Sequence, residues 1–121
     1  MIEKVIILDF GSQYTQLIAR RIRELNIYCE ILPFNKHLNL SSAKAIVLSG
    51  SPFSVNEIDS PRIDLKEIIG KIPVLGLCYG AQLIAKEYGG KVTKSNLREY
   101  GRANLCYVSK ISQLMRGIDL N

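Results

Sequence analysis

Short runs of apolar residues constrain the fold of this chain more than any other feature. Three of them are "VIILDF" at 5–10, "AIVLSG" at 45–50 and "VLGLC" at 74–78, and "YCEILPF" at 28–34 reads as a further strand. The runs are nearly continuous instead of alternating with polar residues. Strands have this pattern when both faces of a sheet are covered, as in parallel sheets. The sequence therefore predicts a mostly parallel sheet.

A helical pattern follows the first apolar run, over residues 13–25. Its apolar residues recur at helical spacing. They are Tyr14, Leu17, Ile18, Ile22 and Leu25. Ser12 is placed to cap the start of this helix, and Asn26 is placed to take the left-handed conformation at its end.

Two more helices are predicted further along the chain. One begins at Pro61 with Ser60 as its cap and stops at Gly70, and the other covers 79–88 before a Gly-Gly pair. Alternating strands and helices indicate a doubly wound α/β domain with helices on both faces of the sheet. A chain of 121 residues holds one such domain at most.

The pattern weakens towards the end of the chain. Segments 90–95 ("GKVTKS") and 103–109 ("ANLCYVS") read as later strands. The last residues, "RGIDLN", carry no helix stop signal. That is typical of the middle of a domain, so we expect residues 1–121 to form the N-terminal part of a C-terminally incomplete domain.

The net charge of +5 does not indicate a nucleic-acid partner. Arg20, Arg21 and Arg23 share one predicted helix without interleaved aromatic residues, which is typical of a solvated helix face. The N-terminal apolar run is too short to cross a bilayer and has no signal-peptide cleavage pattern, so no membrane partner is expected.

The cysteines also narrow the function classes. Cys29, Cys78 and Cys106 are widely spaced, no CxxC occurs, and His37 is the single histidine. This set gives little support to a metal site, and we expect none. A sparse, odd number of cysteines suits a reducing cytosol, so we expect a cytoplasmic protein.

Cys78 stands in "GLCYG" at 76–80, which has the spacing of the nucleophile elbow G-x-S-x-G with cysteine replacing serine. The strand-like run before it and the helical run after it match the context of that motif. The positive end of the helix would favour a thiolate at Cys78. A buried structural cysteine between two packing glycines explains the spacing about equally well.

The carboxyl ends of the predicted parallel strands meet at one rim, where open α/β sheets bind ligands. Residues 9–13, 49–52 and 78–80 would meet there. The Tyr79 N–H is expected to face a developing oxyanion, with a second donor from Gly50 or Ser51. His37 lies in a loop after the second strand and reads as a surface residue, so Cys78 has no convincing base.

Several segments carry a family resemblance. They are "ILDFGSQYTQLIARRIRELNIYCEI" at 7–31, "VLSGSP" at 47–52, "GLCYGAQLIAKEYGG" at 76–90 and "SNLREYG" at 95–101. The chain resembles the N-terminal, class I glutamine amidotransferase domain of glutamine-hydrolysing GMP synthases. The opening segment and "REYG" favour this family over the amidotransferases of anthranilate or carbamoyl phosphate synthesis.

The resemblance implies that Cys78 attacks the glutamine amide, releases ammonia and forms a glutamyl thioester. It also implies that Gln82, four residues after Cys78, contacts the glutamine substrate. The ammonia would pass to a synthetase (ATP pyrophosphatase) domain of the same parent chain and aminate XMP to GMP. ATP and magnesium are therefore expected for the parent, which the resemblance implies is a homodimer, and no cofactor is expected in residues 1–121.

Two departures from the family pattern stand out. The family usually has a second glycine where this chain has Ser51, and its histidine and acidic partner would lie beyond Asn121. The ATP pyrophosphatase and dimerisation regions are absent from this sequence as well. We therefore expect little or no glutaminase activity from residues 1–121 alone. The alternative is a truncated, non-catalytic module that binds glutamine or a partner.

Overall fold

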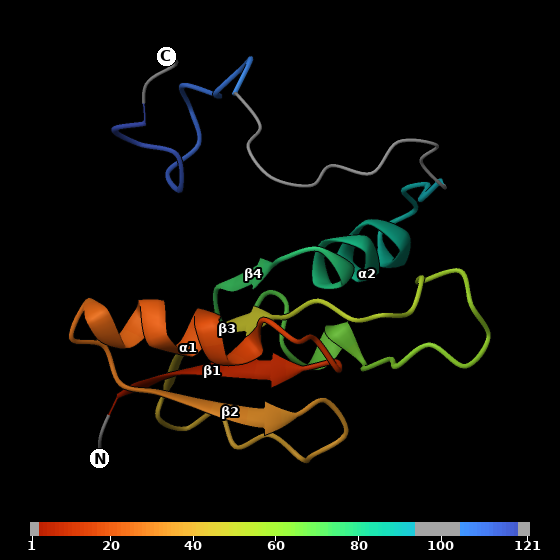
Figure 1. Cartoon of the computed structure of the whole chain (residues 1–121), viewed down its shortest axis with the longest axis horizontal. Coiled ribbons are helices and arrows are strands. Elements are labelled where there is room, and N and C mark those ends of the chain that lie inside the picture. Colours follow the sequence, from red (N-terminus) through yellow and green to blue (C-terminus); the bar gives the residue numbers. More distant parts are fainter. Residues whose placement is uncertain (1–2, 94–104, 119–121) are drawn as a thin grey trace.

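A parallel sheet forms the centre of the molecule (Figure 1). The computed structural model describes residues 3–93 and 105–118. Within these residues a four-stranded sheet has the order β2-β1-β3-β4, and every pairing is parallel. The strands are β1 (Lys4–Asp9), β2 (Cys29–Pro33), β3 (Ala43–Leu48) and β4 (Val74–Gly76). The predicted parallel sheet is confirmed.

Helices lie on both faces of this sheet, as the sequence predicts for a doubly wound domain. Helix α1 (Thr15–Glu24) packs against β1 and β2, and α2 (Tyr79–Glu87) packs against β3 and β4. On the α2 face the buried residues are Ile6, Leu8, Phe10, Ile46, Leu48, Val55, Leu65, Ile68, Tyr79 and Leu83. On the α1 face they are Ile7, Ala19, Cys29 and Val47. Neighbouring residues of β1 alternate between these two cores, as strand geometry requires.

The helix predicted between Pro61 and Gly70 is wrong. Only a single 3₁₀ turn, η1 (Leu65–Glu67), forms there, and the Asp64 carboxylate caps it by accepting the Lys66 N–H at 3.1 Å. The Ser60 hydroxyl donates to the Glu57 carbonyl instead of capping a helix. Leu65 and Ile68 are both buried. Residues three apart lie on one side of a 3₁₀ turn, so this turn directs both side chains into the core.

The predicted cap of α1 is also wrong, because the helix begins three residues after Ser12. The Ser12 hydroxyl accepts the Tyr14 N–H at 3.0 Å, within the loop that precedes the helix. Asn26 has a φ of 62°, so the predicted left-handed residue after the helix is confirmed. Helix α2 ends close to the predicted position, before Gly89 at a φ of 84°.

The later strands predicted at 90–95 and 103–109 are not found in the residues that the structure describes. Residues 90–93 and 105–109 form no strand, and the remainder of both segments lies outside the described residues. Leu105 and Tyr107 are exposed. A strand needs a hydrogen-bonded neighbour, and β4 pairs only with β3 among the described strands.

An ion pair joins the first two strands near their amino ends. Lys4 Nζ donates to Glu30 Oε1 at 3.0 Å. This hydrogen bond is the main reason why the pKa of the Glu30 carboxyl is lowered from its ordinary value.

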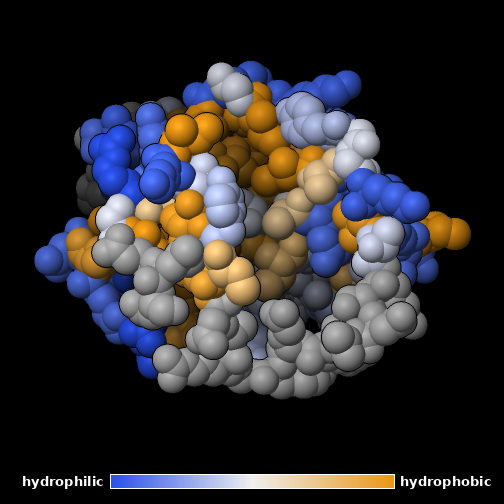
Figure 2. Space-filling model, turned by 90° about the horizontal axis from the view of Figure 1, so that it is seen from above, coloured by the Kyte–Doolittle hydropathy of each residue, from blue (hydrophilic) through white to orange (hydrophobic). Residues whose placement is uncertain are grey.

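The α1 face of the sheet carries a large apolar groove of about 690 Å³. It runs between α1 and the strands β3 and β4, and Leu17, Val47 and Leu75 are among its lining residues. Figure 2 shows hydrophobic residues gathered around a hollow when the molecule is viewed from above. The sheet is therefore covered less completely on this face than on the α2 face.

Candidate active site

The turn at Cys78 joins the end of β4 to the start of α2. Cys78 has φ 52° and ψ −112°, and the only other non-glycine residue with positive φ in the described part is Asn26. A cysteine side chain rarely takes this conformation, because its Cβ is crowded there. The Cys78 side chain is nevertheless exposed. The elbow that the sequence predicts is thus present as a strained turn that presents a thiol to solvent.

The glycines on either side of Cys78 have a steric reason. A Cβ on Gly80 would lie 2.5 Å from Leu48 Cβ, and a Cβ on Gly76 would lie 2.8 Å from the Ala81 nitrogen. Real Cβ atoms do not approach other heavy atoms so closely. Glycine is therefore required at both positions for α2 to pack against β3 behind the turn.

Backbone hydrogen bonds fix the elbow to the end of β3. The Leu77 N–H donates to the Leu48 carbonyl at 3.0 Å, and the Gly80 N–H donates to the Ser49 carbonyl at 3.1 Å. Ser49 is fully buried and extends this connection to β1. Its hydroxyl accepts the Phe10 N–H at 3.0 Å and lies 3.1 Å from the Gly50 carbonyl, to which it donates. The carboxyl ends of three strands are therefore tied together.

A cavity of about 370 Å³ opens where these strand ends meet. Its walls are Gly11, Ser12, Gln13, Tyr14, Gly50, Ser51, Pro52 and Cys78. A Cβ built on Gly50 would lie 3.5 Å from Cys78 Cβ. The structure therefore brings three of the predicted site residues together, namely Cys78, Gly50 and Ser51.

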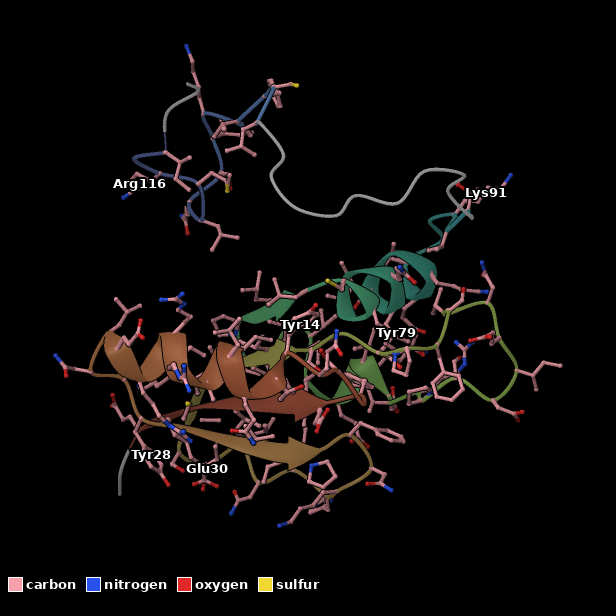
Figure 3. All side chains as sticks on the ribbon, in the orientation of Figure 1. Tyr14, Tyr28, Glu30, Tyr79, Lys91 and Arg116 are labelled. Carbon is pink, nitrogen blue, oxygen red and sulfur yellow. The ribbon has the colours of Figure 1, made fainter. Side chains whose placement is uncertain are left out.

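The other two predicted site residues do not line this cavity with their side chains. Tyr79 is buried, its ring lies against that of Phe10, and its hydroxyl donates to the Pro61 carbonyl at 2.5 Å. Figure 3 labels Tyr79 near α2. Gln82 is half-buried on α2, and its N–H donates to the Cys78 carbonyl at 3.2 Å. Any part that Tyr79 plays at Cys78 would therefore come from its backbone.

The backbone N–H groups next to Cys78 are not used by the fold. Those of Gly50, Ser51 and Tyr79 make no hydrogen bond with any residue that the structure describes. Tyr79 is the first residue of α2, and the first N–H groups of a helix have no partner within the helix. Such groups attract anions, so this end of the cavity can accept negative charge on an oxygen atom.

The single histidine lies far from Cys78. His37 is exposed in the loop after β2, whereas Cys78 follows β4 at the opposite edge of the sheet. Three strand spacings of about 4.8 Å separate those strands, or about 14 Å in all. His37 lines a different cavity, with Arg62 and Asp64. The described residues therefore provide no histidine base for Cys78.

The loop between β1 and α1 contributes more of the cavity than the sequence suggested. The sequence placed residues 9–13 at this rim but assigned Ser12 to the start of a helix, and Tyr14 to its apolar face. Both residues line the cavity. The signal that could have found them is their position directly after the carboxyl end of β1.

No membrane or metal site is evident in the described parts of the chain. The helices found there are too short and too polar to cross a membrane. His, Cys, Asp and Glu side chains do not gather there in groups of three or more that could hold a metal ion.

Comparison with known proteins places the chain in a family. The glutamine amidotransferase class-I profile matches residues 6–119. The glutamine-hydrolyzing GMP synthase of Christiangramia forsetii is 58% identical over 122 aligned positions, covering 100% of this chain and 24% of that protein. That of Bacteroides fragilis is 55% identical over 119 positions, covering 98% and 24%. This chain thus spans about a quarter of the length of the curated relatives it matches.

A solved structure agrees with this assignment. It is the crystal structure of a protein from Thermoplasma acidophilum, provisionally assigned as one subunit of a GMP synthase, with 30% sequence identity and a TM-score of 0.61. The match covers 84% of this chain and 52% of the other. The profile match over most of the sequence and the shared fold lead to one conclusion: the chain belongs to the class-I glutamine amidotransferase family.

Proposed function

We propose that Cys78 is the nucleophile of a glutamine-hydrolysing site. The observation that carries this proposal is the strained backbone of Cys78, which holds an exposed thiol against a cavity at the carboxyl ends of three strands. Strain of this kind is retained where function requires it. Helix α2 begins directly after Cys78, so the positive end of its dipole lies at the proposed nucleophile.

The proposed reaction balances in two steps. The Cys78 sulfur forms a bond to the amide carbon of glutamine, the carbon–nitrogen bond breaks, and the thiol proton leaves with the nitrogen as ammonia. Water then adds to the glutamyl thioester, which releases glutamate and restores the thiol. The N–H groups of Gly50, Ser51 and Tyr79 are proposed to stabilise the oxyanion in both steps. Gln82 is proposed to contact the glutamine substrate.

Similarity to full-length GMP synthases supports a wider proposal. The chain would act as the amidotransferase part of such a synthase, in the cytoplasm, supplying ammonia that converts XMP to GMP in purine biosynthesis. The partner would be a synthetase domain of the same parent chain, within a homodimer. ATP and magnesium would bind to that domain. The described residues offer no carboxylate cluster for magnesium.

Labelling of the cysteines tests the nucleophile. In the folded chain, we expect iodoacetamide to alkylate Cys78 faster than Cys106, although both are exposed, and far faster than buried Cys29. Excess L-glutamine should slow the labelling of Cys78 alone. Mass spectrometry of the peptides measures all three rates. Equal rates at Cys78 and Cys106, with no protection by glutamine, would contradict the proposal.

The proposal also predicts little or no ammonia release from glutamine by the 121-residue chain alone. The reason is the distance between Cys78 and the only histidine, His37. An ammonia assay on the purified chain measures this, with Cys78→Ala as the control. Turnover at the level of a complete amidotransferase, lost in the control, would show that a base is present after all.

The absence of a histidine near Cys78 in the described residues also favours a second function, a non-catalytic module that binds glutamine or a partner. Calorimetry and labelling together separate the two functions. Glutamine binding measured by calorimetry, with Cys78 alkylated no faster than Cys106, supports the module. A glutamyl adduct on Cys78 supports the enzyme.

A further inference from the structure

A serine hydroxyl from the loop between β1 and α1 lies near Cys78 in the lining of the cavity. A Cβ built on Gly50 would lie 3.5 Å from Ser12 Oγ and also 3.5 Å from Cys78 Cβ. Because both atoms lie 3.5 Å from one point, at most twice that distance, 7.0 Å, separates them. Both side chains line the cavity, so one small group bound there lies within reach of both.

The Ser12 hydroxyl still has a proton to donate. Its oxygen accepts the Tyr14 N–H at 3.0 Å, and in the described part of the chain it donates to no acceptor. A hydroxyl can donate one hydrogen bond while it accepts others. Ser12 can therefore keep its place in the loop and donate a hydrogen bond into the cavity.

The loop holds Ser12 in a fixed position. Asp9 Oδ1 accepts the Gly11 N–H at 2.8 Å and lies 3.2 Å from Thr15 Oγ1, which donates to it. Thr15 is buried, and its hydroxyl is also 3.2 Å from the Ser12 carbonyl. These contacts fix the backbone both before and after Ser12. A donor held in this way needs little rearrangement when a substrate binds.

We propose that Ser12 is a catalytic residue whose hydroxyl donates a hydrogen bond to the oxygen of the reacting amide. The inference rests on the proposed attack of Cys78 on glutamine. Because Ser12 Oγ lies at most 7.0 Å from Cys78 Cβ, an amide whose carbon contacts the Cys78 sulfur can place its oxygen within hydrogen-bond reach of the hydroxyl. When the thiolate attacks, the amide oxygen gains negative charge, and its hydrogen bond from Ser12 strengthens.

The test uses a chloroketone analogue of glutamine, L-2-amino-5-oxo-6-chlorohexanoic acid, on the 121-residue chain. Its ketone oxygen takes the place of the amide oxygen, and Cys78 displaces chloride. We expect Ser12→Ala to slow Cys78 labelling at least about tenfold, as expected for loss of one oxyanion donor. Ser12→Thr, which keeps the hydroxyl, should retain most of the rate. Iodoacetamide, which lacks the α-amino and α-carboxylate groups of glutamine, should label all variants equally.

A matched control removes a serine hydroxyl that makes the same local hydrogen bond elsewhere in the chain. Ser54 Oγ accepts the Asn56 N–H at 3.3 Å, two residues on, and Ser54 does not line the cavity. Ser54→Ala should leave the chloroketone rate unchanged. Equal chloroketone rates for Ser12→Ala and the unaltered chain would overturn the role of Ser12 alone. No preference of the chloroketone for Cys78 over Cys106 in the unaltered chain would overturn the proposed function as well.

Discussion

At the scale of single residues, the strained backbone of Cys78 destabilises the folded state. Its φ of 52° and ψ of −112° are unfavourable for any side chain with a Cβ. Such strain costs about 1–3 kcal/mol, whereas the extra chain entropy of a glycine costs about 0.5–1 kcal/mol. We therefore expect Cys78→Gly to raise the free energy of unfolding by about 1 kcal/mol, the difference between these terms.

Urea denaturation followed by circular dichroism measures this change, with reductant present to keep Cys29 and Cys106 reduced. Cys78→Ala is the matched control, because it removes the sulfur but keeps the Cβ and hence the strain. It should leave the free energy of unfolding nearly unchanged. If the glycine variant is no more stable than the alanine variant, the turn is not strained.

The glycines around the site differ in how much room they have. A Cβ on Gly80 would meet Leu48 Cβ at 2.5 Å, whereas one on Gly50 would meet its nearest neighbours at 3.5 Å, an ordinary contact. We expect Gly80→Ala to lower the free energy of unfolding by about 3 kcal/mol, at the upper end for overpacking. Gly50→Ala should change it by less than about 1 kcal/mol. Equal losses in thermal or urea denaturation would contradict this account of the elbow.

At the scale of elements, an irregular segment covers part of one sheet face beside α2, where the sequence predicts a further helix. The chain between β3 and β4 forms only the turn η1, yet Val55, Leu65 and Ile68 from this segment are buried in the α2-face core. We expect Leu65→Ala to lower the free energy of unfolding by about 2–4 kcal/mol, because it removes a buried side chain. Ile58, which is 96% exposed in the same segment, is the control. Ile58→Ala should have no measurable effect in urea denaturation, and a similar loss for both would show that the segment is not packed.

The strands and α1 could be predicted because their signals are local. Continuous apolar runs mark buried strands. Asn26 follows α1 in the left-handed conformation that asparagine tolerates better than most residues. The 3₁₀ turn in segment 61–70 could not be predicted. Ser60 and Pro61 resemble the start of a helix, but burial of Leu65 and Ile68 overrides this local signal. The place of Ser12 depends on Gly50 and Cys78, which are far away in sequence. A single sequence can predict where strands end. It cannot predict which side chains from different loops come into contact at the carboxyl ends of the strands.

At the scale of the whole molecule, the two faces of the sheet are unequally covered. The α2 face has α2, η1 and the segment between β3 and β4. On the other face, α1 packs on β1 and β2 and leaves the 690 Å³ groove beside β3 and β4. Parallel sheets are normally covered on both faces. Exposed apolar surface of this kind is typical of interaction sites.

We therefore expect the chain to enhance the fluorescence of the dye ANS, which binds exposed apolar surface. Leu17→Glu should reduce this enhancement severalfold, because Leu17 lines the groove from α1 and is 44% exposed, so that a carboxylate there adds charge without burying it. Leu25→Glu is the matched control. Leu25 follows the same helix and is 71% exposed, but it does not line the groove.

Near-ultraviolet circular dichroism must stay unchanged in both variants, because loosely packed states also bind ANS. With that condition met, a loss of dye binding in Leu17→Glu alone assigns the dye to the groove. The same loss in Leu25→Glu would show that the dye does not bind specifically in the groove. No fluorescence enhancement in the unaltered chain would mean that the α1 face is covered in solution.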